Sequence, residues 1–172
     1  MDPIELITTR RSIRRYQQRD IPDEVVHKII RAAMSAPSAG NQQPWQFIVV
    51  RDRQKLNKIP DFHPYCKVVT KAPLALIVCG DPVGKKWPDF WVQDCSAAIQ
   101  NLLLAARAEG VGTVWTGVYP IEERMEGCRN LFSIPAHIIP LAIIPMGWPQ
   151  EQTEFKEVDR YRPELIHLDQ YR

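Results

Sequence analysis

The sequence contains no apolar run as long as the ~18 residues that a membrane-spanning helix needs. Its first residues, MDPIELI, are acidic and lack the basic-then-apolar pattern of a secretory signal. Hydrophobic residues still make up 45% of the 172 residues, which is enough to build a folded core. We therefore expect a soluble cytoplasmic protein that does not associate with a membrane.

Motifs for metal ligands and for catalytic nucleophiles are also absent. The four cysteines form no C-x-x-C pair, and the four histidines form neither H-x-x-x-H nor H-E-x-x-H. Cys79 and Cys95 lie in apolar or small-residue runs, so we expect buried free thiols of the kind found in a reducing cytoplasm. No Ser, His and Asp set or nucleophile elbow stands out. The sequence thus predicts no metal site and no catalytic side chain.

Two glycine-containing segments match nucleotide-binding motifs only in part. GVGTVWTG has Trp115 where the third glycine should stand, and it follows an expected helix rather than a strand. GDPVGKK is one residue shorter than a phosphate-binding loop and lacks the Ser or Thr after its lysine. We interpret the first segment as a helix end and the second as a surface turn with solvated lysines.

Positive charge is concentrated in one segment of a chain that is otherwise nearly neutral. Lys and Arg number 22 and Asp and Glu number 20, so the net charge is +2. This balance argues against a nucleic-acid-binding protein, yet TTRRSIRR at residues 8–15 holds four arginines. Paired guanidinium forks match the oxygens of a phosphate monoester. Cations at a helix end also interact favourably with the helix dipole, so the segment alone leaves both interpretations open.

The pattern of apolar residues predicts an α+β domain, a mixed sheet flanked by helices, that spans residues 1–172. Helices are expected where apolar residues recur at helical spacing, including a short one capped by Asp2: residues 2–7, 21–36, 91–110 and 121–132. Strands are expected in apolar runs bounded by turn residues: residues 45–51, 73–81, 111–118 and 140–145. The last stretch, from about residue 150, is too polar to fold by itself and is expected to lie along another surface.

A second polar segment, PSAGNQQPW, places amide side chains in a turn just before the strand at 45–51. Amides both donate and accept hydrogen bonds, which suits the heteroatom edge of a planar heterocycle. By itself this segment is only a loop, and its meaning comes from its spacing relative to RRSIR.

Taken together, the motifs resemble the flavin-dependent nitroreductase family in its short, minimal form. The matching segments occur in the same order over nearly the whole chain: RRSIR, AAMSAPSAGNQQPWQFIVV, DCSAAIQNLLLAARAEGVGTVWTG, IPAHIIPLAIIPMGWP and DRYRPELIH. The resemblance implies a mainly antiparallel nitroreductase-like sheet and an intertwined homodimer that binds FMN at its interface. It also implies that residues from about 150 to 172 wrap around the partner subunit. The small residues of the helix that begins near Asp94 would pack against their symmetry mate.

The resemblance also implies which residues bind the cofactor. The phosphate and ribityl chain would contact residues near the start of the chain: Arg10, Arg11, Ser12 and Arg14. The flavin ring would be lined from the partner subunit by residues of the polar loop: Pro37, Ser38, Ala39, Asn41 and Gln43.

Three further positions complete the implied site. Thr116 and Gly117 would lie near the reactive nitrogen of the ring, and Arg160 would complete the phosphate site. Many relatives carry a basic residue two positions before that arginine, where this chain has Val158, and Lys156 is the nearby candidate to replace it.

The function implied by the resemblance is electron transfer from NADH or NADPH to a small electron-poor acceptor, a nitroaromatic or a quinone, by a ping-pong mechanism. Two alternatives stay open: a flavin enzyme of the same fold that dehalogenates a substrate or fragments the flavin, and a non-catalytic flavin carrier or sensor. Aromatic residues from Phe62 to Trp91 are candidates for a lid over the acceptor, although core or interface packing is their other interpretation.

Overall fold

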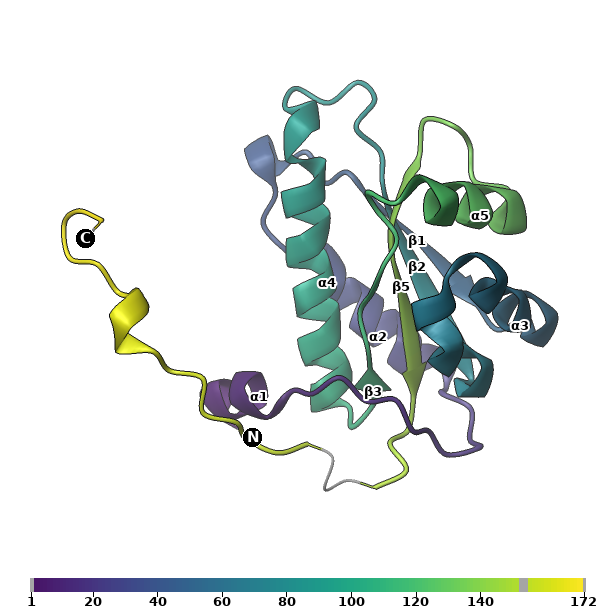
Figure 1. Cartoon of the computed structure of the whole chain (residues 1–172), viewed down its shortest axis with the longest axis horizontal. Coiled ribbons are helices and arrows are strands. Elements are labelled where there is room, and N and C mark those ends of the chain that lie inside the picture. Colours follow the sequence, from purple (N-terminus) through teal and green to yellow (C-terminus); the bar gives the residue numbers. More distant parts are fainter. Residues whose placement is uncertain (1, 152–154, 172) are drawn as a thin grey trace.

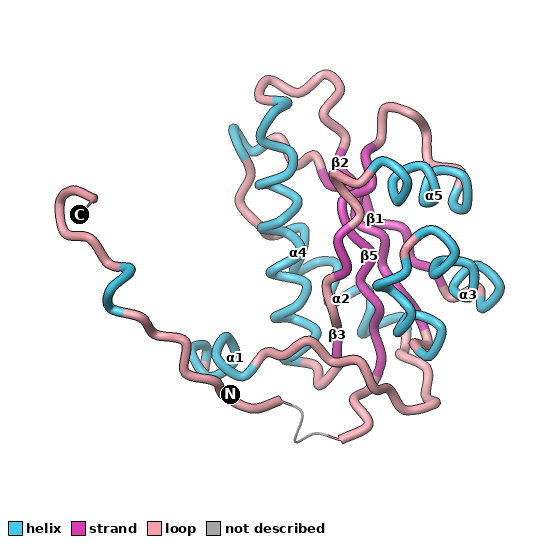
Figure 2. Tube along the Cα trace, in the orientation of Figure 1, coloured by secondary structure: helices cyan, strands magenta, loops and turns pink. Residues whose placement is uncertain are grey.

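The computed structural model describes residues 2–151 and 155–171. A central antiparallel sheet lies between two layers of helices (Figures 1 and 2). The strands are β1 (Trp45–Val50), β2 (Leu74–Gly80), β3 (Gly112–Thr113), β4 (Thr116–Gly117) and β5 (Ile139–Gly147). The sheet order is β1-β2-β5-β3, and β4 also pairs with β5. The expected α+β fold with a mainly antiparallel sheet is confirmed.

Strand β2 is buried on both faces, which explains its uninterrupted apolar sequence. Leu74, Leu76 and Val78 pack toward α2 (Asp23–Met34) and α4 (Trp91–Ala108). The alternate residues Ala75 and Ile77 pack on the opposite side, where α3 (Arg53–Phe62) and α5 (Glu122–Phe132) lie. The alternation of side chains along the strand thus supplies both cores.

The start of the chain forms the expected short helix and then runs in an extended conformation past Thr113 and Pro149. Helix α1 (Pro3–Thr9) begins at Asp2, whose Oδ2 accepts hydrogen bonds from the backbone N–H groups of Ile4 (2.9 Å) and Glu5 (3.2 Å). After the helix, Ser12 bridges to Thr113 and Tyr16 bridges to Pro149. The arginine-rich segment therefore leaves α1 as predicted and lies beside β3.

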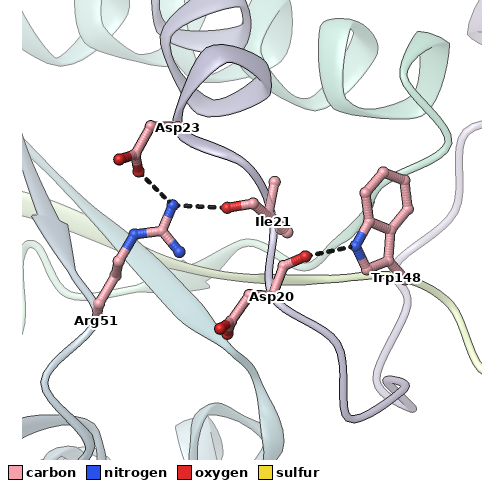
Figure 3. A network of polar contacts seen from close by, with 5 residues as sticks. All are labelled: Asp20, Ile21, Asp23, Arg51 and Trp148. Carbon is pink, nitrogen blue, oxygen red and sulfur yellow. Dashed lines mark hydrogen bonds and ion pairs between the residues drawn. The ribbon is translucent and has the colours of Figure 1, made fainter.

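Polar contacts fix the entry to α2 (Figure 3). The Nη2 of Arg51, just after β1, donates to the Ile21 carbonyl and lies 2.7 Å from Asp23 Oδ1. The indole N–H of Trp148, just after β5, donates to the Asp20 carbonyl at 3.0 Å. These contacts attach the segment before α2 to the ends of two strands.

Two predicted strands differ in detail from the structure. The expected strand at 111–118 is divided into β3 and β4, each of two residues. β5 extends beyond Pro140 and Pro145, which were expected to bracket it, because a proline carbonyl can still accept a hydrogen bond. The Pro145 carbonyl, for example, accepts from the Val114 N–H at 3.3 Å.

Helix α3 and the 3-10 helix at Pro64–Lys71 were not predicted. The signal for α3 was Asp52, whose Oδ1 caps the helix by accepting from the Gln54 N–H (2.8 Å) and the Lys55 N–H (3.2 Å). Leu56 and Ile59 supply its fully buried side. Polar residues between them and Pro60 inside the helix weaken the pattern.

All four cysteines are free and buried, as predicted for Cys79 and Cys95. Burial raises the pKa of Cys79 and Cys95 to about 12. It also raises the pKa of Cys66 to about 11, although a hydrogen bond from Thr116 partly lowers that pKa. These thiols therefore stay protonated near neutral pH and belong to the core.

Gly127 lies inside α5, where glycine weakens a helix, but it allows α5 to pack closely on α3. A Cβ at this position would lie 2.2 Å from Cγ and 2.5 Å from Cβ of Phe62. The glycine costs the helix about 1 kcal/mol of propensity, which is less than the clash that a larger residue would cause.

We predict that Gly127→Ala lowers the free energy of unfolding by up to about 2 kcal/mol, because displacing Phe62 costs about 1–3 kcal/mol and the gain in helix propensity offsets only about 1 kcal/mol. Urea denaturation measures the change, and Phe62→Leu in the same chain should restore part of it. Glu126→Ala, at an exposed position of the same helix, is the control and should change stability little. Equal stability of the Gly127→Ala and Glu126→Ala variants would contradict this account of the helix packing.

Candidate functional site

The arginine segment is held against β3 by backbone contacts. Ser12 lies beside Thr113, and the Ile13 N–H donates to the Thr113 carbonyl at 2.9 Å. Ile13 is buried, so its neighbours Ser12 and Arg14 project outward and are exposed. The Nη1 of Arg14 makes only a long contact of 3.4 Å with the Ser12 carbonyl.

Arg11 is half-buried and only partly satisfied. Its Nη1 donates to the Arg10 carbonyl at 2.8 Å. Its Nε and Nη2 are buried and have no hydrogen-bond partner among the residues that the structure describes. Buried guanidinium nitrogens are costly unless something accepts their hydrogens, so this side chain indicates an anion.

Arg160 of the C-terminal segment joins this cluster. Burial, then the charges of Arg11 and Arg160, lower the pKa of Arg10 below its ordinary value. The three arginines line one cavity of about 320 Å³, together with Glu157, Val158, Asp159 and other neighbours, so its cations outnumber its carboxylates. A negative ligand in that cavity would relieve the repulsion between the guanidinium groups.

Arg107, at the end of α4, fixes the relative positions of the segments that carry the arginines. Its Nε and Nη2 donate to the Thr9 hydroxyl at 3.3 Å and 3.2 Å. Its guanidinium carbon lies 4.2 Å from the centre of the Phe155 ring. One side chain thus connects the ends of α1 and α4 with the C-terminal segment. Sequence reasoning missed this residue because its partners are distant in sequence.

The polar loop at residues 37–43 lies at the other end of α4. The Ala39 N–H donates to Oδ1 of Asp94 at 2.9 Å, in the first turn of that helix. The Gln43 N–H donates to the Ser38 hydroxyl at 3.0 Å, and the Gln43 side chain donates to Asn41 Oδ1 at 3.1 Å. Pro37, Asn41 and Gln43 are exposed, so the polar edge of the loop faces outward.

The backbone of this loop is unusual. Gly40 has φ +55°, and the non-glycine residues Asn41 and Gln43 have φ +55° and +48°. Left-handed conformations of non-glycine residues are unfavourable and are found mainly where the surrounding contacts enforce them, often at functional sites. The internal bonds from Gln43 supply such contacts.

The structure therefore brings together some of the predicted site residues and separates others. Arg107 binds next to the arginine segment, and Asp94 binds the polar loop. These two α4 residues are 13 positions apart, which corresponds to about 20 Å along a helix. The loop and the arginine segment of one chain therefore lie near opposite ends of α4 (Figure 1).

Thr116 and Gly117 form β4, which pairs with Ile143 and Ala142 of β5. Thr116 is buried, and its hydroxyl donates to the Ile143 carbonyl at 2.7 Å and contacts Cys66 Sγ at 3.2 Å. Its side chain is therefore occupied within the protein. At Gly117, in contrast, an added Cβ would meet no atom within 4 Å. Open space beside Gly117 fits the prediction that this position leaves room for a ligand.

In the described part of the chain, no helix has the length and apolar composition needed to cross a membrane. The same residues contain no group of His, Cys, Asp and Glu side chains arranged to hold a metal ion.

Comparison with known proteins identifies the family. The model of the nitroreductase family matches residues 7–63 and 63–148. The chain belongs to the nitroreductase family. The resemblance noted in the sequence is thereby confirmed, and with it the class of oxidoreductases to which the chain was assigned.

Individual nitroreductase relatives match almost the full length of the chain. A protein of Methanothermobacter thermautotrophicus, provisionally named NADH dehydrogenase/NAD(P)H nitroreductase, is 55% identical over 171 residues, 99% of this chain and 88% of the relative. A Bacteroides thetaiotaomicron structure with the same provisional name is 42% identical, with a TM-score of 0.91, and the match covers 98% of this chain and 97% of that one.

One solved nitroreductase relative contains a cofactor. It comes from Desulfovibrio desulfuricans and is provisionally described as a nitroreductase in complex with FMN. It is 30% identical to this chain, with a TM-score of 0.83, and the match covers 100% of this chain and 99% of that one.

His63 lies behind Gly117 and was not predicted as part of the site. It is 1% exposed, and neither ring nitrogen has a well-aligned hydrogen-bond partner among the described residues. Burial, followed by the Arg124 charge, lowers the pKa of His63, and contact with the Gly117 backbone partly offsets both. The Nη1 of Arg124 donates to the Gly117 carbonyl at 2.9 Å, so both side chains adjoin the same glycine.

We predict that His63 makes the protein less stable in mild acid. Because its pKa is lowered by folding, the unfolded chain takes up a proton first as the pH falls below about 6.5, and stability is lost by up to about 1.4 kcal/mol per pH unit. Urea denaturation at pH 7.5 and pH 5.5 tests this, and His63→Asn should reduce the difference between the two values. His137→Asn, at an exposed position, should leave this difference in unfolding free energy unchanged. If His63→Asn also leaves it unchanged, His63 is not the cause of the acid sensitivity.

Proposed function

We propose that this protein binds FMN and transfers electrons from NADH or NADPH to a small electron-poor acceptor, a nitroaromatic or a quinone. The observation that carries the proposal is the buried, partly unsatisfied guanidinium of Arg11 beside Arg10 and Arg160. In a family that includes an FMN complex, a phosphate monoester is the anion that best fits this cluster.

The phosphate end of the cofactor site fits the residues present. Arg10, Arg11 and Arg160 line one cavity, and the exposed side chains of Ser12 and Arg14 follow directly along the segment. Val158 lines the same cavity, and Lys156 is exposed, so Lys156 is the candidate cation where relatives have a basic residue at 158. Each charge-assisted bond to phosphate contributes about 1.5–3 kcal/mol.

The ring end of the site requires a second copy of the chain. The polar loop and the arginine segment lie near opposite ends of α4, and we infer that the loop reaching each ligand comes from the partner chain. In a homodimer the loop of the partner supplies the ring contacts assigned to Pro37, Ser38, Ala39, Asn41 and Gln43. Gly117 leaves space for the ring on the first chain, and Thr116 contributes through its backbone because its hydroxyl is already used.

The C-terminal segment supports the same dimer. It extends away from the helices and strands (Figure 1) and exposes large apolar side chains: Tyr161, Leu165, Ile166, Leu168 and Tyr171. Apolar side chains on an extended segment are stabilised when another surface covers them. In this proposal the chain is one domain of residues 1–172, and residues from about 150 to 172 wrap around the partner. Residues 152–154 and 172 of that segment lie outside the described part of the chain.

The small residues of α4 serve partly within the subunit. Cys95 and Ala98 are fully buried against the sheet and α2 of their own chain. Ser96 and Ala97 remain partly exposed and are the α4 residues available to a symmetry mate.

When bound, FMN supplies the redox chemistry, and the residues of the chain bind and orient it. The arginines hold the anionic end, the loop presents amides to the ring edge, and the space at Gly117 admits the nicotinamide or the acceptor. No side chain is required as a general acid or base, and none is assigned that role. Donor and acceptor use the same open face in turn, which leads to ping-pong kinetics.

We predict that Arg10→Ala with Arg14→Ala raises the dissociation constant for FMN at least about 100-fold, because two guanidinium–phosphate contacts are lost. Fluorescence titration of the apoprotein with FMN measures the constant. Arg31→Ala, an exposed arginine of α2, is the control, and circular dichroism should show all variants folded. Full cofactor occupancy in the double variant would count against the assignment.

We predict steady-state oxidation of NADH or NADPH with menadione, with parallel lines in double-reciprocal plots. Parallel lines arise because the first product leaves before the acceptor binds. Bound FMN without any turnover would identify a flavin carrier or sensor instead. Turnover with iodinated phenols but not with quinones or nitroaromatics would identify a dehalogenating enzyme.

A further inference from the structure

Gln42, which is not among the predicted cofactor-binding residues, connects the polar loop to the segment of residues 81–90. Its Nε2 donates to the Trp87 carbonyl at 2.8 Å, and its Oε1 accepts from the Trp87 N–H at 3.1 Å. The side-chain amide thus pairs with the backbone of Trp87 in both directions. It does not depend on the indole ring.

Asp94 fixes the orientation of this amide. The carboxyl group is 5% exposed, and its two oxygens accept from the Ala39 N–H (2.9 Å) and from Gln42 Nε2 (3.0 Å). Because a carboxylate only accepts hydrogen bonds, Nε2 must face Asp94, and Oε1 must face the Trp87 N–H. The rigid helix α4 therefore holds both the loop and the amide that links it to residues 81–90.

The indole of Trp87 consequently lies against the polar loop. A Cβ at Gly40 would be 3.2 Å from both Cδ1 and Nε1 of that ring, so only glycine leaves this much space for it. Lys85 strengthens the junction, because its Nζ donates to the Gln42 carbonyl at 2.9 Å. Trp87 belongs to none of the hydrophobic clusters and remains 46% exposed.

A fixed, half-exposed indole is unusual for a residue that serves only packing. Its electron-rich face favours offset stacking on a planar, electron-poor ring, which is the class of acceptor in the proposed function. The indole lies beside the loop that is assigned to the flavin ring, so it adjoins the proposed site of electron transfer; the Nζ of Lys86 lies 5.3 Å from the ring centre on one face.

We propose that Gln42 is a positioning residue that holds residues 81–90 against the polar loop, so that the Trp87 indole forms one wall of the acceptor site and favours extended aromatic acceptors. This inference rests on the proposed function. It assigns acceptor selectivity to two residues: Gln42, which acts by binding the backbone of Trp87, and Trp87, which acts through its ring.

The two roles can be tested separately. Gln42→Glu keeps the size of the side chain but places a carboxylate against the Trp87 carbonyl and Asp94, which should release residues 81–90. Trp87→Ala removes the ring and keeps the backbone that Gln42 binds, and Trp87→Phe restores an aromatic ring. Gln54→Glu makes the same chemical change at an exposed position of α3 and is the matched control. Each variant is purified with FMN and assayed anaerobically for NADH oxidation by menadione, which has two rings, and by 1,4-benzoquinone, which has one.

We expect Gln42→Glu and Trp87→Ala to lower the ratio of kcat/KM for menadione to that for benzoquinone by roughly threefold to tenfold, mainly through KM. Trp87→Phe should keep most of this kcat/KM ratio, and Gln54→Glu should keep all of it. The FMN content should be the same in all the variants. An unchanged ratio in Trp87→Ala overturns the proposal, even if Gln42→Glu does not fold. Loss of FMN from Gln42→Glu also overturns it, since the junction would then hold the cofactor. Failure of the unmodified protein to oxidise NADH with either quinone would refute the proposed function itself.

Discussion

Repulsion among guanidinium groups that are held close together is the constraint on which the candidate site depends. Arg10 and Arg11 are adjacent and half-buried, and Arg160 approaches them from the other end of the chain. Packing holds this arrangement together, because Arg107 joins the ends of α1 and α4 to Phe155. A fold that keeps buried, unsatisfied positive charge in one place is prepared to bind an anion, since binding recovers the cost of burying and crowding the charges.

Helix α4 determines how this anion site relates to the rest of the proposed function. Its last turn anchors the arginines and its first turn anchors the polar loop, so the two halves of the site are separated by the length of a rigid element. In the proposed homodimer both halves would reach one ligand, and the exposed apolar side chains of the C-terminal segment would give that dimer a further contact. The Gln42–Asp94 pair extends the role of α4 to residues 81–90, and through them to the proposed acceptor site.

Local patterns predicted the elements whose signals are strong. Asp2 and Pro3 began α1, the apolar stripes gave α2 and α4, and the apolar runs gave β1 and β2. The expectations were less accurate where tertiary contacts override local preference. Polar residues and Pro60 obscured α3, and Gly127, which weakens a helix, is required by Phe62 of the neighbouring helix. The family and its fold were recognised from the order of the motifs, and the individual cofactor contacts remain predictions.

The sequence by itself determined the helices and strands with strong local signals, the near-neutral charge with one arginine cluster, and the family. The elements depend on residues close together in the chain, where periodicity and spacing are informative, and the family depends on the order of short motifs along the chain. Only the tertiary structure decided that Arg160 joins Arg10 and Arg11, that Thr116 directs its hydroxyl to Ile143, and that Gln42 binds Trp87. These contacts join residues far apart in sequence, and they form because the two cores on the faces of β2 fix where α4, the loops and the strand ends meet.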